Sequence, residues 1–262
     1  MAHVLCYGDS LTAGFCSGGL RFEPYSNALK AALEAHGCAD ARVSVCGLSG
    51  LTAKQMAADV DSDRVMDVCG HSGMGLRRMI ADQGVPDIVL IMAGTNDIAY
   101  RRNAASILRD ISYLHEICHE YGVPTIAMAP PSPLQHVRVR VSGLLRTWAR
   151  ASRDCVAFVD PEKDMVPRST PGFWEPDCLH MSPLGYHVLG ENIAPVVAEK
   201  VKKASSRGFS CELGLDRPSV LNLLRSLSGP RDTSGRSSSR LSAMGAKARS
   251  RTTGLLRKLQ SW

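Results

Sequence analysis

The stretch VLCYGDSLTAG, residues 4–14, decides the fold. Residues 4–7 form a short apolar run typical of a strand that is covered on both faces. The small and polar residues that follow are typical of a turn into a helix. The first turn of that helix would direct N–H groups and positive dipole toward Ser10. Asp9 and Ser10 also fit an ordinary helix cap, so this stretch alone leaves both capping and catalysis open.

Apolar runs alternate with helix-period segments along the chain, and this alternation predicts an α/β fold. Strands alternating with helices form a mostly parallel sheet with helices on both faces. In such a sheet, functional residues gather at the carboxyl ends of the strands. The predicted strands are residues 4–7, 42–46, 87–93, 124–129 and 155–159, and the predicted helices are 24–36, 52–59, 75–83, 103–121, 141–153 and 183–202.

The last sixty residues differ in composition from the rest. Residues 203–262 contain 12 Lys or Arg and 3 Asp or Glu, whereas the remainder has a net charge near −3. We therefore predict a folded domain at 1–202 and a basic Ser/Gly/Arg-rich tail at 203–262. The tail is expected to be largely disordered, with short helices at 219–227 and 254–262. Its charge predicts weak contact with anionic membranes.

Composition excludes several classes of protein. Apolar stretches all fall short of the roughly 18 residues that span a membrane. The chain begins with neither a basic leader nor a cleavage site, which predicts a cytoplasmic protein. Nine scattered cysteines, none in a C-x-x-C pair, predict reduced thiols rather than disulfides or a zinc knuckle. The mildly acidic body gives no reason to expect nucleic-acid binding.

Two further polar clusters lie at the ends of predicted elements. One follows the strand at 87–93, and the other precedes the last helix. Asn96, directly after the run at 87–93, could donate its amide toward the sheet edge. Asp177 lies three residues before His180, a spacing that lets a carboxylate hold one imidazole nitrogen and leave the other free. A serine needs such a base to act as a nucleophile. Ser10, Asn96, Asp177 and His180 therefore supply complementary parts of an acyl-transfer site.

Four sequence blocks resemble the SGNH hydrolase family, also called GDSL esterases and lipases. They are YGDSLTAG at 7–14, GLSGLT at 47–52, GTND at 94–97 and DCLHMSPLGY at 177–186. The resemblance covers about residues 3–202. It implies a flavodoxin-like three-layer α/β/α sandwich around a five-stranded parallel sheet.

The resemblance also implies a role for each matching residue. Ser10 would be the nucleophile, with His180 as its base and Asp177 as the orienting carboxylate. The backbone N–H groups of Ser10 and Gly50 and the side chain of Asn96 would form the oxyanion hole. The predicted activity is a serine esterase that acts on a small or lipid-like carboxylic ester, without cofactor or metal. The alternative is a degenerate hydrolase domain that serves as a binding module, with the basic tail for anionic membranes or acidic partners.

Residues 115–119 read HEICH, which matches the H-E-x-x-H pattern of zinc proteases. On a helix, His115 and His119 would share one face. We favour a structural interpretation, because the segment lies on a helix between two strands, where exposed polar residues are expected. The apolar positions Ile117 and Cys118 continue the buried face of that helix.

Overall fold

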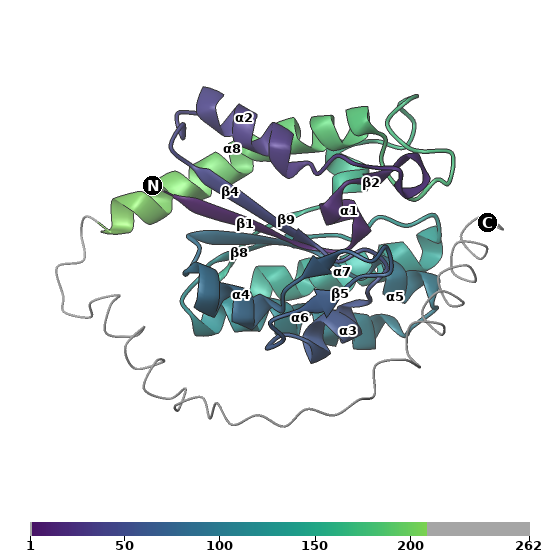
Figure 1. The fold of residues 1–262 in the computed structure, drawn as a ribbon, viewed down its shortest axis with the longest axis horizontal. Coiled ribbons are helices and arrows are strands. Elements are labelled where there is room, and N and C mark those ends of the chain that lie inside the picture. The colour runs from purple at the N-terminus through teal and green to yellow at the C-terminus, as the bar shows by residue number, and fades with distance from the viewer. Residues whose placement is uncertain (1, 209–262) are drawn as a thin grey trace, which may run out of the picture. The chain divides into compact units, whose positions relative to one another are not determined.

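The computed structural model describes residues 2–208, with side chains described to residue 203. Five parallel strands form the central sheet in the order β4-β1-β7-β8-β9 (Figure 1). This order reverses its direction between β1 and β7, which is the flavodoxin-like arrangement with its site at the switch point. The predicted five-stranded parallel sheet is confirmed. The strands are β1 (His3–Gly8), β4 (Arg42–Gly47), β7 (Ile88–Met92), β8 (Thr125–Met128) and β9 (Cys155–Val159).

Helices cover both faces of the sheet, which makes three layers (Figure 1). One face packs against α2 (Ser26–Ala35) and α8 (Pro183–Gly208). The other face packs against α3 (Ala53–Ala58), α4 (Leu76–Gln83), α6 (Ala104–Glu120) and α7 (Gln135–Ala151).

The apolar strands divide their side chains between these two cores. Leu5 and Tyr7 of β1 belong to the core under α3, α4, α6 and α7. Val4 and Cys6 belong to the core under α2 and α8. All four are almost completely buried, as expected where successive side chains point to opposite faces of a covered strand.

Helix boundaries agree with the sequence where a local cap marks them. Thr52 begins α3 with a capping box, in which its hydroxyl accepts from the Gln55 N–H at 3.2 Å and the Gln55 side chain accepts from the Thr52 N–H at 2.9 Å. The start of α7 was predicted at 141, but the helix begins at Gln135. The alternating sequence VRVRV at 137–141 carries no helical period, and the ion pairs of Arg138 with Asp160 and Glu162 hold it in the helix.

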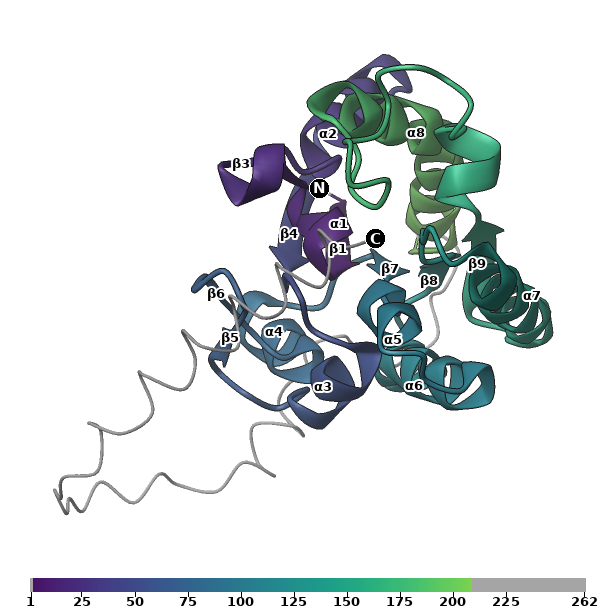
Figure 2. The ribbon, with the colours of Figure 1, turned by 90° about the vertical axis from the view of Figure 1, so that its right-hand side faces the viewer.

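Short elements at the carboxyl edge escaped prediction (Figure 2). They are too brief to show a period of their own, because two-residue strands have no alternation to detect. They comprise a hairpin of β2 (Phe15–Cys16) and β3 (Arg21–Phe22), a hairpin of β5 (Val65–Met66) and β6 (Ser72–Gly73), and single turns at Ser17–Gly19 and Pro161–Met165.

The last helix runs beyond its predicted end. It was expected to stop at 202 but continues to Gly208, across the predicted boundary between domain and tail. The helices predicted at 219–227 and 254–262 lie outside the described residues, and the two-part division stays a prediction. Within residues 2–208, no helix combines the length and apolar character that crossing a bilayer requires.

Candidate active site

The carboxyl edge of the sheet brings together residues from four distant parts of the chain (Figure 2). Ser10 begins the short helix α1 (Ser10–Ala13) directly after β1. Gly50 lies in the loop after β4, and Asn96 lies in α5 (Thr95–Ala99) after β7. Because β4 and β7 flank β1, these three residues follow adjacent strands. Asp177 and His180 come from the loop before α8.

Ser10 is in direct hydrogen-bond contact with His180. Its Oγ lies 3.0 Å from His180 Nε2, and both side chains are buried. Asp9 caps α1 by accepting from the Leu11 N–H at 3.1 Å, and α1 ends at Gly14 in the left-handed conformation, φ 77°. The serine hydroxyl is thus held at a strand-to-helix turn facing the imidazole.

Asp177 contacts the opposite nitrogen of the same imidazole. Its Oδ2 lies 2.7 Å from His180 Nδ1, and its Oδ1 accepts from the N–H groups of Leu179 and His180 at 2.9 Å each. Burial would raise the pKa of Asp177, but these hydrogen bonds outweigh it and lower the pKa below its usual value. A carboxylate at Nδ1 places the ring proton there, so that Nε2 can accept from Ser10.

An aromatic side chain that sequence reasoning missed supports the imidazole. The ring of Phe15 lies 4.4 Å from the ring of His180, centroid to centroid, and Phe22 packs edge-on against Phe15. The Tyr186 hydroxyl donates to the Phe15 carbonyl at 2.9 Å. Tyr186 therefore anchors the β2–β3 hairpin beside His180, a role that its place in the DCLHMSPLGY block did not indicate.

Backbone geometry at Gly50 excludes a side chain. Gly50 has φ +76°, and a Cβ there would come within 2.4 Å of the Val68 side chain. Val68 donates its N–H to the Ser49 carbonyl at 3.1 Å, so the β5–β6 hairpin packs closely beneath this loop. The loop therefore exposes backbone rather than side-chain atoms at Gly50.

The loop at Gly50 is tied to α5. Asn96 Nδ2 donates to the Leu51 carbonyl at 2.9 Å, and Asp97 Oδ2 accepts from the Ala53 N–H at 2.7 Å. Asp97 is fully buried and pairs with Arg102. The amide of Asn96 has two hydrogens, and one of them is used in holding it beside the loop. Asp97 belongs to the GTND block, but nothing in the sequence indicated that it holds the start of α3.

The family comparison agrees with this geometry. A sequence model described as the GDSL-like lipase/acylhydrolase family matches residues 6–188, well over half of the chain. The chain belongs to this family. The resemblance seen in the four sequence blocks is confirmed, and membership makes the chain a hydrolase of carboxylic esters. A comparison with curated protein sequences finds no match.

Solved structures share the GDSL fold with this chain. A carbohydrate acetylesterase family member from Sinorhizobium meliloti matches with 23% identity and a TM-score of 0.59, over 77% of this chain and 100% of that one. A lipase/acylhydrolase from Enterococcus faecalis matches with 24% identity and a TM-score of 0.59, over 76% and 97%. TesA matches with 19% identity and a TM-score of 0.60, over 76% and 99%. At these identities the likeness shows the fold.

The H-E-x-x-H segment of this GDSL hydrolase lies far from the carboxyl edge. His115 was expected on an exposed face, but it is completely buried. Its Nδ1 and the Nε2 of His119 both contact the Thr125 hydroxyl, at 2.8 and 2.9 Å. Burial lowers the pKa of His115 to about 3, so its ring is neutral. In residues 2–208, no group of three or more His, Cys, Asp or Glu side chains is placed to hold a metal ion.

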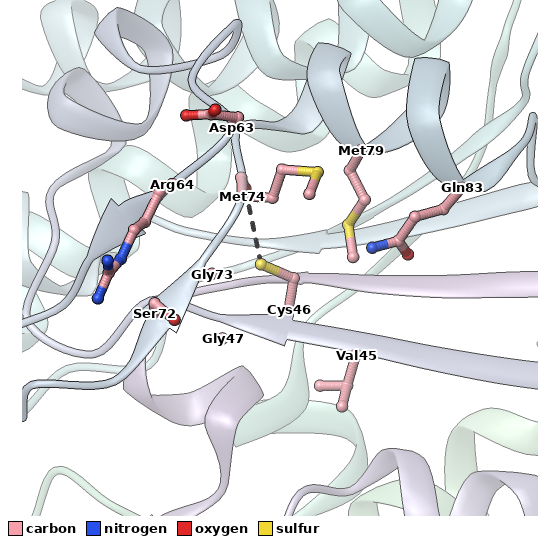
Figure 3. Close-up of a pocket in the computed structure, with 10 residues that line it drawn as sticks. All are labelled: Val45, Cys46, Gly47, Asp63, Arg64, Ser72, Gly73, Met74, Met79 and Gln83. Atoms are coloured by element: carbon pink, nitrogen blue, oxygen red, sulfur yellow. Dashed lines mark hydrogen bonds between the residues drawn. The ribbon is translucent and has the colours of Figure 1, made fainter.

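A pocket of about 500 Å³ lies between β4, the β5–β6 hairpin and α4 (Figure 3). Its lining includes Cys46, Met74 and Met79, with Arg64 and Gln83. The Cys46 thiol donates to the Met74 carbonyl at 3.7 Å. Ser10, Asp177 and His180 do not line this pocket, whereas Gly47, the first residue of the second sequence block, does.

Proposed function

We propose that the chain is a serine esterase in which Ser10, His180 and Asp177 form the catalytic triad. The single observation that carries the proposal is the continuous contact from Ser10 Oγ through His180 to Asp177, at 3.0 and 2.7 Å. Both distances are within the hydrogen-bond range that proton transfer requires. The arrangement agrees with the roles that serine, histidine and aspartate play in acyl transfer on unrelated folds.

The proposed reaction has two halves. Ser10 Oγ attacks the ester carbonyl while its proton passes to His180 Nε2, and the carbonyl π electrons move to the oxygen. The tetrahedral oxyanion accepts hydrogen bonds from the N–H groups of Ser10 and Gly50 and from the second amide hydrogen of Asn96. The intermediate then collapses, and the alcohol leaves with the proton from His180. Water repeats the sequence on the acyl-enzyme, which releases the acid and restores Ser10.

The proposed substrate is a small or lipid-like ester. Apolar side chains near the site support an apolar acyl or alcohol group. Leu20, in the hairpin beside Phe15, is 89% exposed, and Val68, against Gly50, is 37% exposed. Both side chains belong to segments that contact Phe15 or Gly50, and we propose that they meet an apolar group of the substrate. The structural relatives include a carbohydrate acetylesterase and a lipase, so chain length must be measured directly.

A panel of p-nitrophenyl esters with acyl chains of increasing length tests the activity. The wild type should hydrolyse at least one member, and Ser10→Ala should abolish that hydrolysis. Ser112→Ala is the matched control, because this partly exposed serine on α6 donates to the Arg109 carbonyl at 3.0 Å and belongs to none of the four sequence blocks. Wild-type rates in Ser10→Ala would overturn the proposed nucleophile. An inactive wild type across the panel would favour the binding-module alternative.

The basic tail, 203–262, largely lies outside the described residues, and its contact with anionic membranes stays a prediction. The test uses the full chain with vesicles of neutral lipid and of mixed neutral and anionic lipid. Charge-driven contact should require the anionic lipid and weaken as salt is added. Equal sedimentation with both vesicle types would contradict it.

A further inference from the structure

The segment that carries His180 and Asp177 is a narrow loop rather than part of the sheet. Its two arms are joined by a bridge between Trp174 and Met181, and the Glu175 N–H donates to the His180 carbonyl at 2.9 Å. Cys178, at the tip, has φ +54°, a conformation that non-glycine residues rarely adopt. A residue held in this region persists only where its surroundings keep it there.

Arg168 is the side chain that holds the tip of this loop. Its Nη1 donates to the Cys178 carbonyl at 2.7 Å, and its guanidinium lies 4.1 Å above the Trp174 ring. The Arg168 guanidinium therefore contacts both Cys178 at the tip of the loop and Trp174 on one of its arms. Cys178 follows Asp177 in the chain, so the hydrogen bond from Arg168 restrains the backbone directly next to the orienting carboxylate.

Glu162 fixes Arg168 to the body of the domain. Arg168 Nη2 donates to Glu162 Oε2 at 2.9 Å. Glu162 is buried and also accepts from the Ser132 N–H at 3.1 Å and from the Gln135 side chain at 2.6 Å, and it pairs with Arg138 at 2.9 Å. These partners come from the segment after β8 and from α7, so Glu162 is anchored to the body of the domain.

The orienting carboxylate needs such an anchor. The Asp177 side chain is 36% exposed, whereas His180 is 7% exposed. Packing therefore restrains the imidazole well but leaves the carboxylate dependent on its own loop. Nη1 and Nη2 of Arg168 donate to protein oxygens and Nε lies 2.7 Å from Glu162 Oε1, which argues against a role in binding substrate.

We propose that Arg168 is a positioning residue, which holds the Cys178 carbonyl so that Asp177 stays aligned on His180 Nδ1. The inference rests on the proposed roles of Ser10, His180 and Asp177. Loss of the Arg168 contacts should lower the fraction of molecules in which Asp177 is hydrogen-bonded to His180 Nδ1. Because Arg168 contacts the loop and Glu162 rather than Ser10 or His180, substrate binding should change little.

The test compares Arg168→Ala and Arg168→Lys with Arg78→Ala, an arginine on α4 that pairs with the exposed Asp82. Displacement of a catalytic group by about 1 Å can lower turnover by about 100-fold, so kcat of Arg168→Ala should fall between about 10-fold and 100-fold. KM should stay within about threefold, since ground-state binding is retained. Arg168→Lys should be intermediate, because an ammonium group cannot reach both partners as a planar fork does. Glu162 keeps Arg138 as partner in both variants, so folding should survive.

A second measurement follows the Asp177–His180 hydrogen bond itself, through the far-downfield proton signal of Nδ1–H. Arg168→Ala should broaden or shift this signal, and Arg78→Ala should leave it unchanged. A kcat within about twofold of the Arg78→Ala value, a rise in KM alone, or an unchanged proton signal would each overturn the inference. Ser10→Ala measured alongside separates the two levels: an active Ser10→Ala overturns the proposed function. An inactive Ser10→Ala beside a fully active Arg168→Ala overturns only the role of Arg168.

Discussion

Two regions of the molecule contain a histidine in contact with a hydroxyl group. At the carboxyl edge, His180 Nε2 lies 3.0 Å from Ser10 Oγ. Between α6 and β8, His115 Nδ1 lies 2.8 Å from Thr125 Oγ1. By this distance alone, the second pair is the better hydrogen bond.

The surroundings of the two imidazoles differ in ways that decide their chemistry. Asp177 contacts the second nitrogen of His180, whereas among the described residues Nε2 of His115 has no hydrogen-bond partner. Thr125 opens β8 at the amino edge of the sheet, the end opposite to the site, and it also contacts His119. A histidine–hydroxyl contact therefore becomes a candidate acid-base pair only with a carboxylate behind it and a position at the carboxyl edge.

Removal of the two hydroxyl groups should produce the largest difference in kcat between the two regions. We expect Ser10→Ala to lower kcat by about 10⁶-fold, since the attacking atom is lost. Thr125→Val should leave kcat per folded molecule unchanged but lower stability by about 1–3 kcal/mol, because the buried His115 and the partly buried His119 both lose a partner. Esterase rates and urea unfolding measure both effects. A large kcat loss in Thr125→Val would mean that the two regions are coupled.

Removal of the Asp177 charge should leave His180, like His115, without a carboxylate on its second nitrogen. Asp177→Asn keeps the shape of the side chain but favours the wrong tautomer, and in serine enzymes such a change lowers kcat by about 10⁴-fold. The control is Asp164→Asn, an exposed carboxylate in the turn after β9. Less than a tenfold loss in Asp177→Asn would show that the carboxylate does not orient the base.

Asn96→Ala tests the proposed oxyanion hole, which has no counterpart around His115. Loss of one oxyanion donor lowers kcat by about 10²–10³-fold. Since Asn96 also donates to the Leu51 carbonyl, a small loss of stability should accompany it. Asn27→Ala, an exposed position on α2, serves as control. An unchanged kcat with normal folding would remove Asn96 from the oxyanion hole.

The last expected effect concerns the pH dependence of stability rather than kcat. The pKa of His115 is lowered by burial to about 3 from an unfolded value near 6.5, so the unfolded chain binds the extra proton first. Stability from this group is complete above pH 6.5 and declines as pH falls toward 3, by up to about 1.4 kcal/mol per pH unit. The neighbouring His119, also with a lowered pKa, acts in the same direction.

His115→Phe should reduce this acid-side decline, whereas His136→Phe, at an exposed position, should not. Asp9 opposes the decline, because burial raises its pKa to about 7 and its contribution is lost as pH rises from about 4 to 7. The difference between His115→Phe and wild type therefore isolates the histidine. Thermal unfolding from pH 4 to 8 measures it, and parallel curves for the two proteins would contradict the assignment.

Local sequence patterns determined much of the fold and the positions of the candidate site. Largely apolar runs of four to seven residues predicted four of the five strands, because a strand covered on both faces must be apolar. The fifth, RVSVC at 42–46, alternates polar and apolar residues, and β4 is correspondingly more exposed. Parallel pairing then required that the residues following β1, β4 and β7 meet at one edge. The same reasoning placed Ser10 and Asn96 together without any knowledge of distances, whereas Gly50 was assigned only through the resemblance to the SGNH family.

Only the tertiary structure decided which partners those residues have. The HEICH segment is compatible with a metal site or a buried face, and burial of His115 between α6 and β8 favours the second. Arg168 and Glu162 lie in segments without a motif, and their contact with the Cys178 carbonyl joins groups that no local period connects. Periodicity reports which face of an element is covered, but ion pairs and carbonyl contacts depend on side chains from other elements, and these meet only after the chain has folded.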